Sequence, residues 1–309
     1  MKTSRRIFLK NGALAIAGTA VFASRNVAAA QGNEMLGIQL YTVRDDMSKD
    51  PVGTLKQVAA MGYKNVEHAN YEHRKFYGQS AAEFKKTLDD LGLKMPSGHT
   101  VMGKQHWDAN ANDFTDAWKE TVEDAAAMGQ QFVISPWLDE SMRKNMDDFK
   151  RYMDVFNKCG ELCAKSGMKF GYHNHNFEFN TQIDGRRLYD LILENTNPDL
   201  VIQQMDIGNM YGAGGRALEL IKQYPGRFVS MHVKDEIESA KGDAVPALRM
   251  DEYESTILGG GILPVKEIIK AGRKSGGTIH FIVEQESYQG KTPLACAKED
   301  YDTMKKWGY

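Results

Sequence analysis

The sequence predicts a single-domain (β/α)8 TIM barrel. Three observations carry this prediction: short apolar strands recur along the chain, amphipathic helices that end in glycine alternate with them, and there are eight strands, enough to close a barrel. Nearly continuous apolar runs are typical of parallel strands that are buried on both faces. The predicted strands are residues 37–42, 64–68, 94–99, 132–137, 169–175, 201–206, 228–234 and 279–284.

Local signals mark where the helices between these strands begin and end. Asp50-Pro51 and Thr292-Pro293 each place an N-cap residue before a proline at the first helical position, and Ser80–Glu83 reads as a capping box. Glycines occupy the positions where helices need a left-handed C-terminal residue. They are Gly62, Gly92, Gly129, Gly167, Gly226 and Gly276.

An open, doubly wound sheet is the competing fold for such an alternation. That fold usually carries a glycine-rich phosphate-binding turn after its first strand. The first predicted strand is instead followed by "QLYTVRDD", from Gln39 to Asp46, which contains no glycine. The closed barrel is therefore the expected architecture.

The N-terminus reads as a twin-arginine export signal. "SRRIFLK", from Ser4 to Lys10, places paired arginines before the apolar run Gly12–Ala23, which is shorter than the roughly 20 residues of a membrane span. Ala28–Ala30 offers a small-residue cleavage site. We expect a cleaved signal peptide over residues 1–30, a catalytic domain over 31–309, a periplasmic location and no stable membrane anchor.

Composition excludes other classes of function. With 39 Lys and Arg against 41 Asp and Glu, the chain has no excess of positive charge for a phosphate backbone, so we expect no nucleic-acid partner. Three cysteines are too few for a disulfide framework. Cys159 and Cys163 are four residues apart on an apolar helix face and are predicted to lie in the core. Barrels of this kind often pair, so a homo-oligomer is compatible with the sequence.

Polar residues gather at the carboxyl ends of the predicted strands, where barrels of this class carry their chemistry. In chain order they are Gln39, Tyr41, Glu67, His68, His99, Trp137, His173, His175, Glu178, Gln204, Asp206, His232, Lys234, Glu284 and Glu286.

Many of these residues come in pairs two positions apart, so the two members of a pair point to the same face of a strand. A single buried polar group is often a satisfied core residue. Four consecutive strands ending in this way are harder to explain, and convergent charge requires a counter-charge such as a divalent metal. Two or three carboxylates with one imidazole suit manganese, cobalt or magnesium, with iron or zinc also compatible.

Five segments of the chain carry a resemblance to a known family. "GIQLYTVRDDM", "SPWLDE", "GMKFGYHNHNFEF", "PGRFVSMHVKD" and "IVEQE" resemble the xylose isomerase-like TIM-barrel superfamily, in the sugar phosphate isomerase/epimerase branch, from about Leu36 to the C-terminus. The resemblance implies one metal ion held by residues from strands five to eight. Asp206, His232 and Glu284 match the ligands of strands six, seven and eight.

The fifth strand departs from the commonest family pattern. It reads His173-Asn174-His175 where Glu-Asn-His is usual, and inosose dehydratase-like relatives share this His-x-His. By analogy with them, Glu178 is the expected ligand from this strand and His173 is the alternative. His173 and His175 are otherwise expected to transfer protons, since imidazole titrates near neutral pH.

The resemblance also implies the reaction, which is proton abstraction next to a sugar carbonyl. The histidines favour a lyase or hydratase over an isomerase or epimerase, and a 3-keto-glycoside or a 2-hydroxyglucal fits an exported enzyme. Lys234 is expected to neutralise an enolate oxygen, or else to form an ion pair with Asp235 or Glu236. A non-catalytic periplasmic sugar-binding protein is the alternative from another class. The residues expected to bind the substrate are Gln39, Tyr41, His68, His99, Trp137, Gln204 and Glu286.

Overall fold

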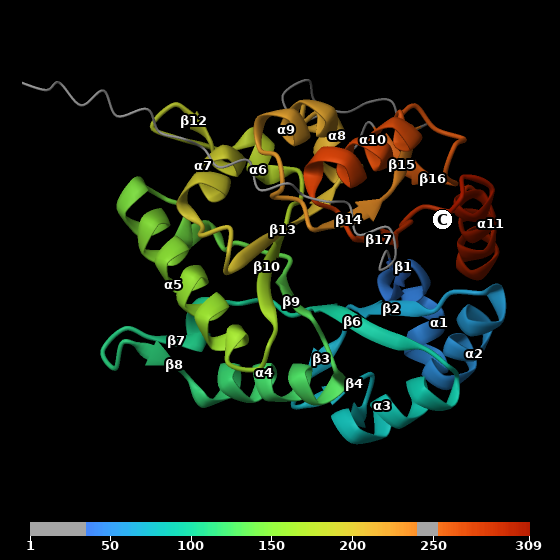
Figure 1. Cartoon of the computed structure of the whole chain (residues 1–309), viewed down its shortest axis with the longest axis horizontal. Coiled ribbons are helices and arrows are strands. Elements are labelled where there is room, and N and C mark those ends of the chain that lie inside the picture. Colours follow the sequence, from blue (N-terminus) through green and yellow to red (C-terminus); the bar gives the residue numbers. More distant parts are fainter. Residues whose placement is uncertain (1–34, 240–252) are drawn as a thin grey trace, which may run out of the picture.

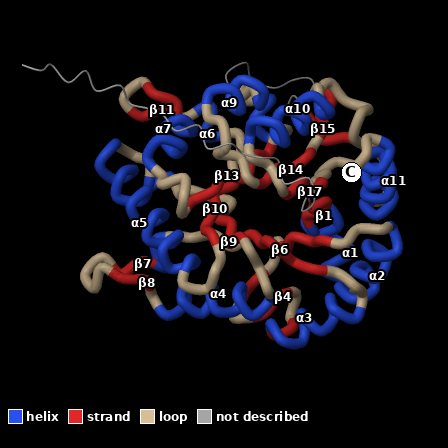
Figure 2. The backbone as a smooth tube through the Cα atoms, in the orientation of Figure 1, coloured by secondary structure: helices blue, strands red, loops and turns tan. Residues whose placement is uncertain are grey.

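The computed structural model describes residues 35–239 and 253–309, and over these ranges it confirms the predicted barrel. Eight parallel strands close on themselves in the order β1-β2-β6-β9-β10-β13-β14-β17. Helices surround this ring (Figures 1 and 2). The barrel strands are β1 Met35–Gln39, β2 Asn65–His68, β6 Lys94–His99, β9 Phe132–Ser135, β10 Lys169–His173, β13 Val201–Asp206, β14 Ser230–Val233 and β17 His280–Val283.

The connections between barrel strands consist of helices and short antiparallel pairs. The α-helices are α1 Arg44–Lys49, α2 Pro51–Met61, α3 Ala81–Asp90, α4 Asp116–Met128, α5 Met146–Ala164, α6 Phe177–Asn180, α7 Leu188–Asn195, α8 Asn209–Gly212, α9 Ala217–Gln223, α10 Val265–Ala271 and α11 Pro293–Lys306. Single helical turns are η1 Leu40–Val43, η2 Lys104–His106, η3 Glu140–Met142 and the π-turn η5 Gly272–Gly276. The short strands are β3 Tyr71–Glu72, β4 Lys75–Phe76, β5 Gln79–Ser80, β7 Trp107–Asp108, β8 Asp113–Phe114, β11 Gln182–Ile183, β12 Arg186–Arg187, β15 Asp235–Glu238 and β16 Tyr253–Thr256.

The predicted helix signals are present, with one correction. The side chain of Asp50 accepts a hydrogen bond from Gly53 N, and the capping box of Ser80 and Glu83 is complete. At the end of the η5 turn the left-handed residue is Gly277, with φ of 83°, and not Gly276. The π-turn places one extra residue before the left-handed position.

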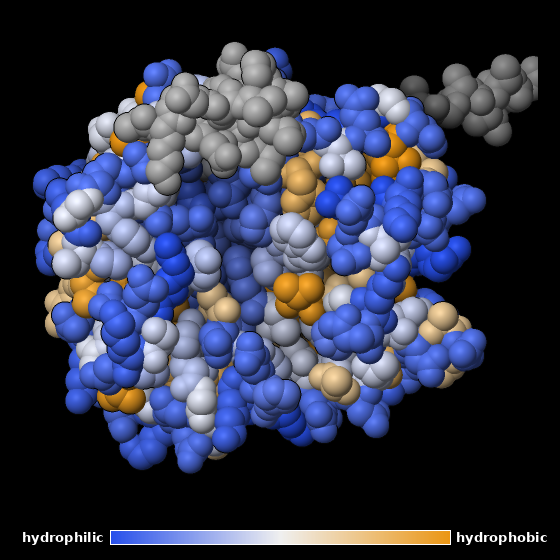
Figure 3. All heavy atoms as spheres, turned by 180° about the vertical axis from the view of Figure 1, so that it is seen from behind, coloured by the Kyte–Doolittle hydropathy of each residue, from blue (hydrophilic) through white to orange (hydrophobic). Residues whose placement is uncertain are grey.

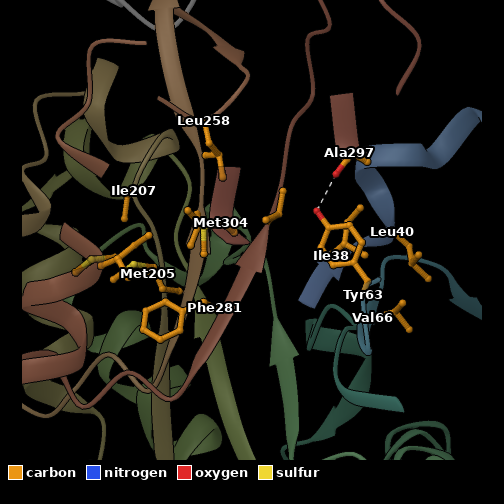
Figure 4. Close-up of a cluster of buried hydrophobic side chains, with 14 of the residues drawn as sticks. Ile38, Leu40, Tyr63, Val66, Met205, Ile207, Leu258, Phe281, Ala297 and Met304 are labelled. Carbon is orange, nitrogen blue, oxygen red and sulfur yellow. Dashed lines mark hydrogen bonds between the residues drawn. The ribbon is translucent and has the colours of Figure 1, made fainter. Parts of the chain in front are cut away.

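Two layers of apolar side chains hold the barrel to its helices. Figure 4 shows part of the larger one, where Ile38, Tyr63 and Met205 lie among buried residues from the strands and from α11. The hydroxyl of Tyr63 donates to the carbonyl of Ala297 at 3.0 Å and so ties the connection before β2 to α11. The second layer includes Cys159 and Cys163, which are buried and free, as predicted.

Inside the barrel, polar side chains lie towards the carboxyl ends of the strands and apolar side chains towards their amino ends. Phe132, Ile134 and Ile202 form a small cluster of their own there. Small residues leave room for them, because a Cβ on Gly171 would lie 2.4 Å from Ile134 and 2.9 Å from Ile202. The polar half contains the site.

The predicted signal peptide, residues 1–30, lies outside the described residues. Within residues 35–239 and 253–309, no helix has both the length and the apolarity required to cross a bilayer.

Candidate functional site

A cavity of about 500 Å³ opens at the carboxyl ends of the barrel strands. One face of the molecule is hollowed near its centre, and hydrophilic side chains line the hollow (Figure 3). The cavity contains seven residues that the sequence predicted for the site: Tyr41, His99, Trp137, His173, His175, Glu284 and Glu286. Ala69, Val101, Pro136, Asn176 and Asn209 complete its lining.

Three of the predicted metal ligands form one buried group. Ligand atoms of Asp206, His232 and Glu284 all lie within 4.8 Å of one another. Asp206 Oδ1 is held by the backbone N–H groups of Gly208 and Asn209, at 2.9 and 2.8 Å. Asp206 Oδ2 accepts no hydrogen bond, although it is buried. The cation beside this buried oxygen is the Lys234 ammonium, whose Nζ lies 3.2 Å away, and the position is equally suited to a metal ion.

His173 and His232 each point one ring nitrogen towards Asp206 Oδ2 and form a hydrogen bond with the other. His232 Nε2 lies 2.6 Å from Glu67 Oε1, and His173 Nδ1 lies 2.9 Å from the amide oxygen of Gln204. Because the amide oxygen of Gln204 can only accept, His173 Nδ1 carries a proton. Burial would lower the pKa of His232, but Glu284 and Glu67 raise it to about 10, so both of its ring nitrogens carry protons. His232 Nδ1 and His173 Nε2 each lie 3.9 Å from Asp206 Oδ2. Metal-binding histidines are commonly oriented by such a partner behind the ring.

Lys234 places an ammonium group among the carboxylates of the site. Its Nζ lies 3.2 Å from Asp206 Oδ2 and 2.9 Å from both Glu284 Oε2 and Glu286 Oε1. Burial would lower the pKa of Lys234, but these carboxylates hold it well above its usual range.

Of the two alternative partners predicted for Lys234, Asp235 is oriented differently, whereas Glu236 lines a cavity together with Lys234 and helps to raise its pKa. Asp235 accepts backbone hydrogen bonds from Gly259, Gly261 and Leu263. Adjacent residues on an extended strand point to opposite faces, so Asp235 faces away from the barrel when Lys234 faces into it. The alternative of an ion pair with Asp235 is corrected to pairs with Asp206 of β13 and with Glu284 and Glu286, which follow β17.

His175 lines the cavity, and one of its ring nitrogens is buried without a hydrogen bond. Its Nδ1 makes no hydrogen bond, and its ring lies against Trp137 and Phe177, with centroids 5.7 and 6.2 Å apart. Burial lowers the pKa of His175 to about 4, so the imidazole is neutral at physiological pH. A neutral imidazole here can accept a proton from a ligand in the cavity.

The structure does not bring Glu178 to the ligand group. Its oxygens accept from the Tyr172 hydroxyl at 2.5 Å and from His175 N at 2.9 Å. β10 ends at His173, and the chain then turns into α6, which carries Glu178 away from the group. The β10 residue that reaches the group is His173, so the expected position of Glu178 is corrected in favour of the alternative.

Three residues predicted to bind substrate do not line the cavity. Gln39 and Gln204 are completely buried and donate to Glu67, each at 2.8 Å. His68 points to the other face of β2, where its ring packs edge-on against Phe76 at 4.9 Å. Gly98 makes room for it, since a Cβ there would lie 1.9 Å from the His68 ring. Gln39 and Gln204 therefore support the site through Glu67, whereas His68 is part of the apolar packing outside the barrel.

Glu67 is the site residue for which the sequence suggested no role. It is completely buried and accepts hydrogen bonds from four side chains, at 2.5 to 2.8 Å: Gln39, Ser97, Gln204 and His232. Burial alone would raise its pKa, but the neighbouring His99 and His232 lower it well below the usual range. Its place at the end of a predicted strand was the only signal in the sequence.

Comparison with known proteins places this geometry in a family. The model of the family described as xylose isomerase-like TIM barrel matches residues 55–307. An inosose dehydratase from Clostridium perfringens is 27% identical over 233 residues, which cover 72% of this chain and 64% of the relative. The chain therefore spans less than two thirds of the length of that relative.

Solved structures agree with this fold. A sugar phosphate isomerase/epimerase from Parabacteroides distasonis superimposes with a TM-score of 0.72 at 25% identity, covering 91% of this chain and 97% of the other. The IolI protein, solved with a zinc atom, gives a TM-score of 0.64 at 14% identity and covers 88% of this chain and 97% of the other. The family match spans most of the chain and contains every residue of the site except Gln39 and Tyr41, and this chain belongs to the xylose isomerase-like TIM-barrel family.

Proposed function

We propose that this protein is a divalent-metal-dependent enzyme that removes a proton next to the carbonyl of a keto-sugar, as a lyase or hydratase. The observation that carries the proposal is the group of Asp206, His232 and Glu284 at the edge of the cavity that His175 also lines. The similarity to an inosose dehydratase supports a dehydratase or lyase reaction on a sugar-like substrate.

The residues present fit a divalent ion. Asp206 Oδ2 is buried without a hydrogen bond, and His232 Nδ1 lies 3.0 Å from Glu284 Oε2 and 3.9 Å from Asp206 Oδ2. The two carboxylates are held together by the positive charge of His232 and Lys234, and a bound divalent ion would take over this role. We propose Asp206, His232 and Glu284 as ligands, with His173 as the fourth. When bound, the ion would polarise the substrate carbonyl as a Lewis acid.

The distribution of acid and base groups favours a lyase or hydratase over an isomerase. Glu284 and Glu286 line the cavity from the end of β17, whereas His173 and His175 line it from the end of β10. An epimerase of this type requires two carboxylates that face each other across the substrate, each able to exchange a proton. Here one side offers carboxylates and the other imidazoles, which suits one base and a separate acid.

His175 is the base in this proposal. Its neutral imidazole lines the cavity and can take the proton from the carbon next to the carbonyl, while the Lys234 ammonium, paired with Glu286, supplies positive charge where the enolate oxygen develops. Trp137 and Tyr41, which are 42% and 43% exposed, offer flat faces for the sugar ring.

A proton NMR time course in heavy water tests the reaction. Keto-sugars, including a 3-keto-glucoside, are incubated with the protein in the presence of manganese, cobalt or magnesium. A lyase or hydratase changes the substitution of the carbon skeleton, whereas an epimerase exchanges deuterium and inverts one centre. Specific binding of the sugars without turnover in the presence of any of these metals would favour a non-catalytic sugar-binding protein. It would refute the proposed enzymatic activity.

Metal analysis tests the ligands independently of turnover. Asp206→Ala and Glu284→Ala are compared with the wild type and with Asp147→Ala, an exposed carboxylate on α5. We expect both site variants to lose bound metal and the control to keep it. Unchanged metal content in both site variants would refute the assignment.

We also propose export to the periplasm by the twin-arginine route, on the strength of the paired arginines in Ser4–Lys10. Fractionation of cells that express the wild type and an Arg5→Lys/Arg6→Lys variant tests this. Equal periplasmic amounts of the two proteins would contradict it.

A further inference from the structure

A second cavity, also of about 500 Å³, lies beside the one that contains the site. The two cavities share Ala69, His99 and Val101, so they adjoin each other at these residues. The outer walls of the second cavity are the turn between β3 and β4 and the beginning of α4. A sugar ring held against His173 and Glu284 occupies the first cavity, because these residues line only that one.

The wall formed by the β3–β4 turn is held in place by several contacts. His73 and Arg74 have positive φ angles of 50° and 61°, a conformation that non-glycine residues adopt only when their surroundings stabilise it. Arg74 makes two hydrogen bonds to Asp124 of α4, at 3.0 and 2.7 Å, and Tyr71 donates to the same carboxylate at 2.7 Å. The second cavity is therefore bounded by a preformed wall.

The chemistry of this second cavity suits a neutral polar group. Its one guanidinium, Arg74, is committed to Asp124 and lies 3.3 Å from Glu120. Burial lowers the pKa of His106, another wall residue, which favours its neutral form. Glu120 and Glu72 add acceptors for hydroxyl groups, and the 41% exposed Val101 offers an apolar contact between the cavities. A phosphate group would meet carboxylates there without an unpaired guanidinium to bind it.

We infer that the substrate is a neutral glycoside of two rings, with its reacting ring in the first cavity and its second ring or aglycone in the second. The inference rests on the proposed function for the position of the reacting ring. The second cavity, beyond His99 and Val101, then distinguishes a glycoside from a free keto-sugar.

The test uses two substrates that differ only in length, a 3-keto-disaccharide and a one-ring methyl 3-keto-glucoside. The variant Ala117→Trp fills the second cavity from the first turn of α4. Its control is Ala82→Trp, at the same second position of α3, on an exposed residue that lines neither cavity. We expect the wild type and the control to prefer the longer substrate by about tenfold in kcat/KM, equivalent to about 1.4 kcal/mol.

In Ala117→Trp we expect this preference to disappear, with kcat/KM for the one-ring substrate within about twofold of the wild type. Equal kcat/KM for both substrates in the wild type, or an unchanged preference in Ala117→Trp, would overturn the inference.

If neither substrate is turned over, the reaction proposed above fails, and calorimetric binding of the same two compounds still decides the inference. A tighter Kd for the longer compound that is lost only in Ala117→Trp supports it. Equal Kd values in the wild type overturn it.

Discussion

Two glutamates near the site are both completely buried, yet their surroundings differ. Glu67 projects into the barrel from β2 and accepts hydrogen bonds from four side chains. Glu178 lies on α6 beside the outer face of β10, where the Tyr172 ring packs on Phe156 of α5. It has one side-chain donor, Tyr172, and one backbone donor, His175.

The difference shows in their pKa values. Burial raises the pKa of both carboxyl groups, but His99 and His232 bring that of Glu67 well below its usual range. No histidine compensates Glu178, and its pKa is raised to about 7. The barrel interior concentrates donors and positive charge around Glu67, whereas both donors to Glu178 are neutral and the charge of Arg143 does not offset its burial. Charge that serves chemistry is therefore stabilised inside the ring.

The largest expected effect comes from removing the inner carboxylate. Glu67→Ala leaves His232 Nε2 and three further donors without their acceptor, so we expect a loss of about 3–5 kcal/mol in the free energy of unfolding. Urea unfolding measures it, with the exposed Glu161→Ala of α5 as the control. A loss no larger than that of the control would show that Glu67 is not the centre of the inner network.

Glu178 should make the free energy of unfolding depend on pH. Glu178 has a folded pKa of about 7 against 4.5 for the free group, so between these pH values the folded state binds more protons than the unfolded state. Its contribution to stability is complete below about pH 4.5 and is lost as the pH rises to about 7, on the order of 3 kcal/mol. Glu178→Gln removes this loss.

Unfolding free energies measured from pH 4.5 to 8 check this prediction, with Glu161→Gln as the control for the change in charge. Parallel curves for Glu178→Gln and the wild type would contradict the raised pKa.

Removing one hydroxyl group that donates to each glutamate compares the two hydrogen-bond networks directly. Tyr172→Phe leaves Glu178 with a single backbone donor, and we expect a loss of about 2 kcal/mol, since a buried charged acceptor loses a strong hydrogen bond. The measurement is urea unfolding at pH 8, where Glu178 is ionised. A smaller loss of stability than in Ser97→Ala, the matched variant at Glu67, would reverse the comparison.

Ser97→Ala is the matched and smallest change. The Ser97 and Tyr172 hydroxyls both lie 2.5 Å from their carboxylate oxygens, but Glu67 retains three other donors. We expect a loss of about 1 kcal/mol or less under the same conditions. A larger loss than that of Tyr172→Phe would mean that the inner donors act as one unit and do not substitute for each other.

The strands and helix ends could be predicted because their signals are local. Asp50 caps α2 and Ser80 caps α3 through contacts three residues away. A run of apolar residues likewise predicts that its strand is buried. The pairs of alternate residues at the ends of β13, β14 and β17 were also predictable, because a strand alternates wherever it lies. Asp206, His232 and Glu284 come together for this reason once the barrel closes.

The contribution of β10 was not predictable in the same way. The expected strand ran to residue 175, but β10 ends at His173, and the turn into α6 decides which side chain reaches the group. Asn174 fixes this turn, because its side chain makes two hydrogen bonds to the backbone of Asp206, at 3.0 and 3.1 Å. That contact joins residues 32 positions apart and has no local signature.

The sequence by itself determined the barrel, the strand ends that carry polar residues, and three of the four proposed ligands. Tertiary structure decided that His173 and not Glu178 lies at the group, that Gln39 and Gln204 support Glu67 from below, and that a second cavity adjoins the first. The physical reason is range. Capping, alternation and apolar runs act over a few residues, whereas the partners of a buried carboxylate come from strands that meet only when the ring closes.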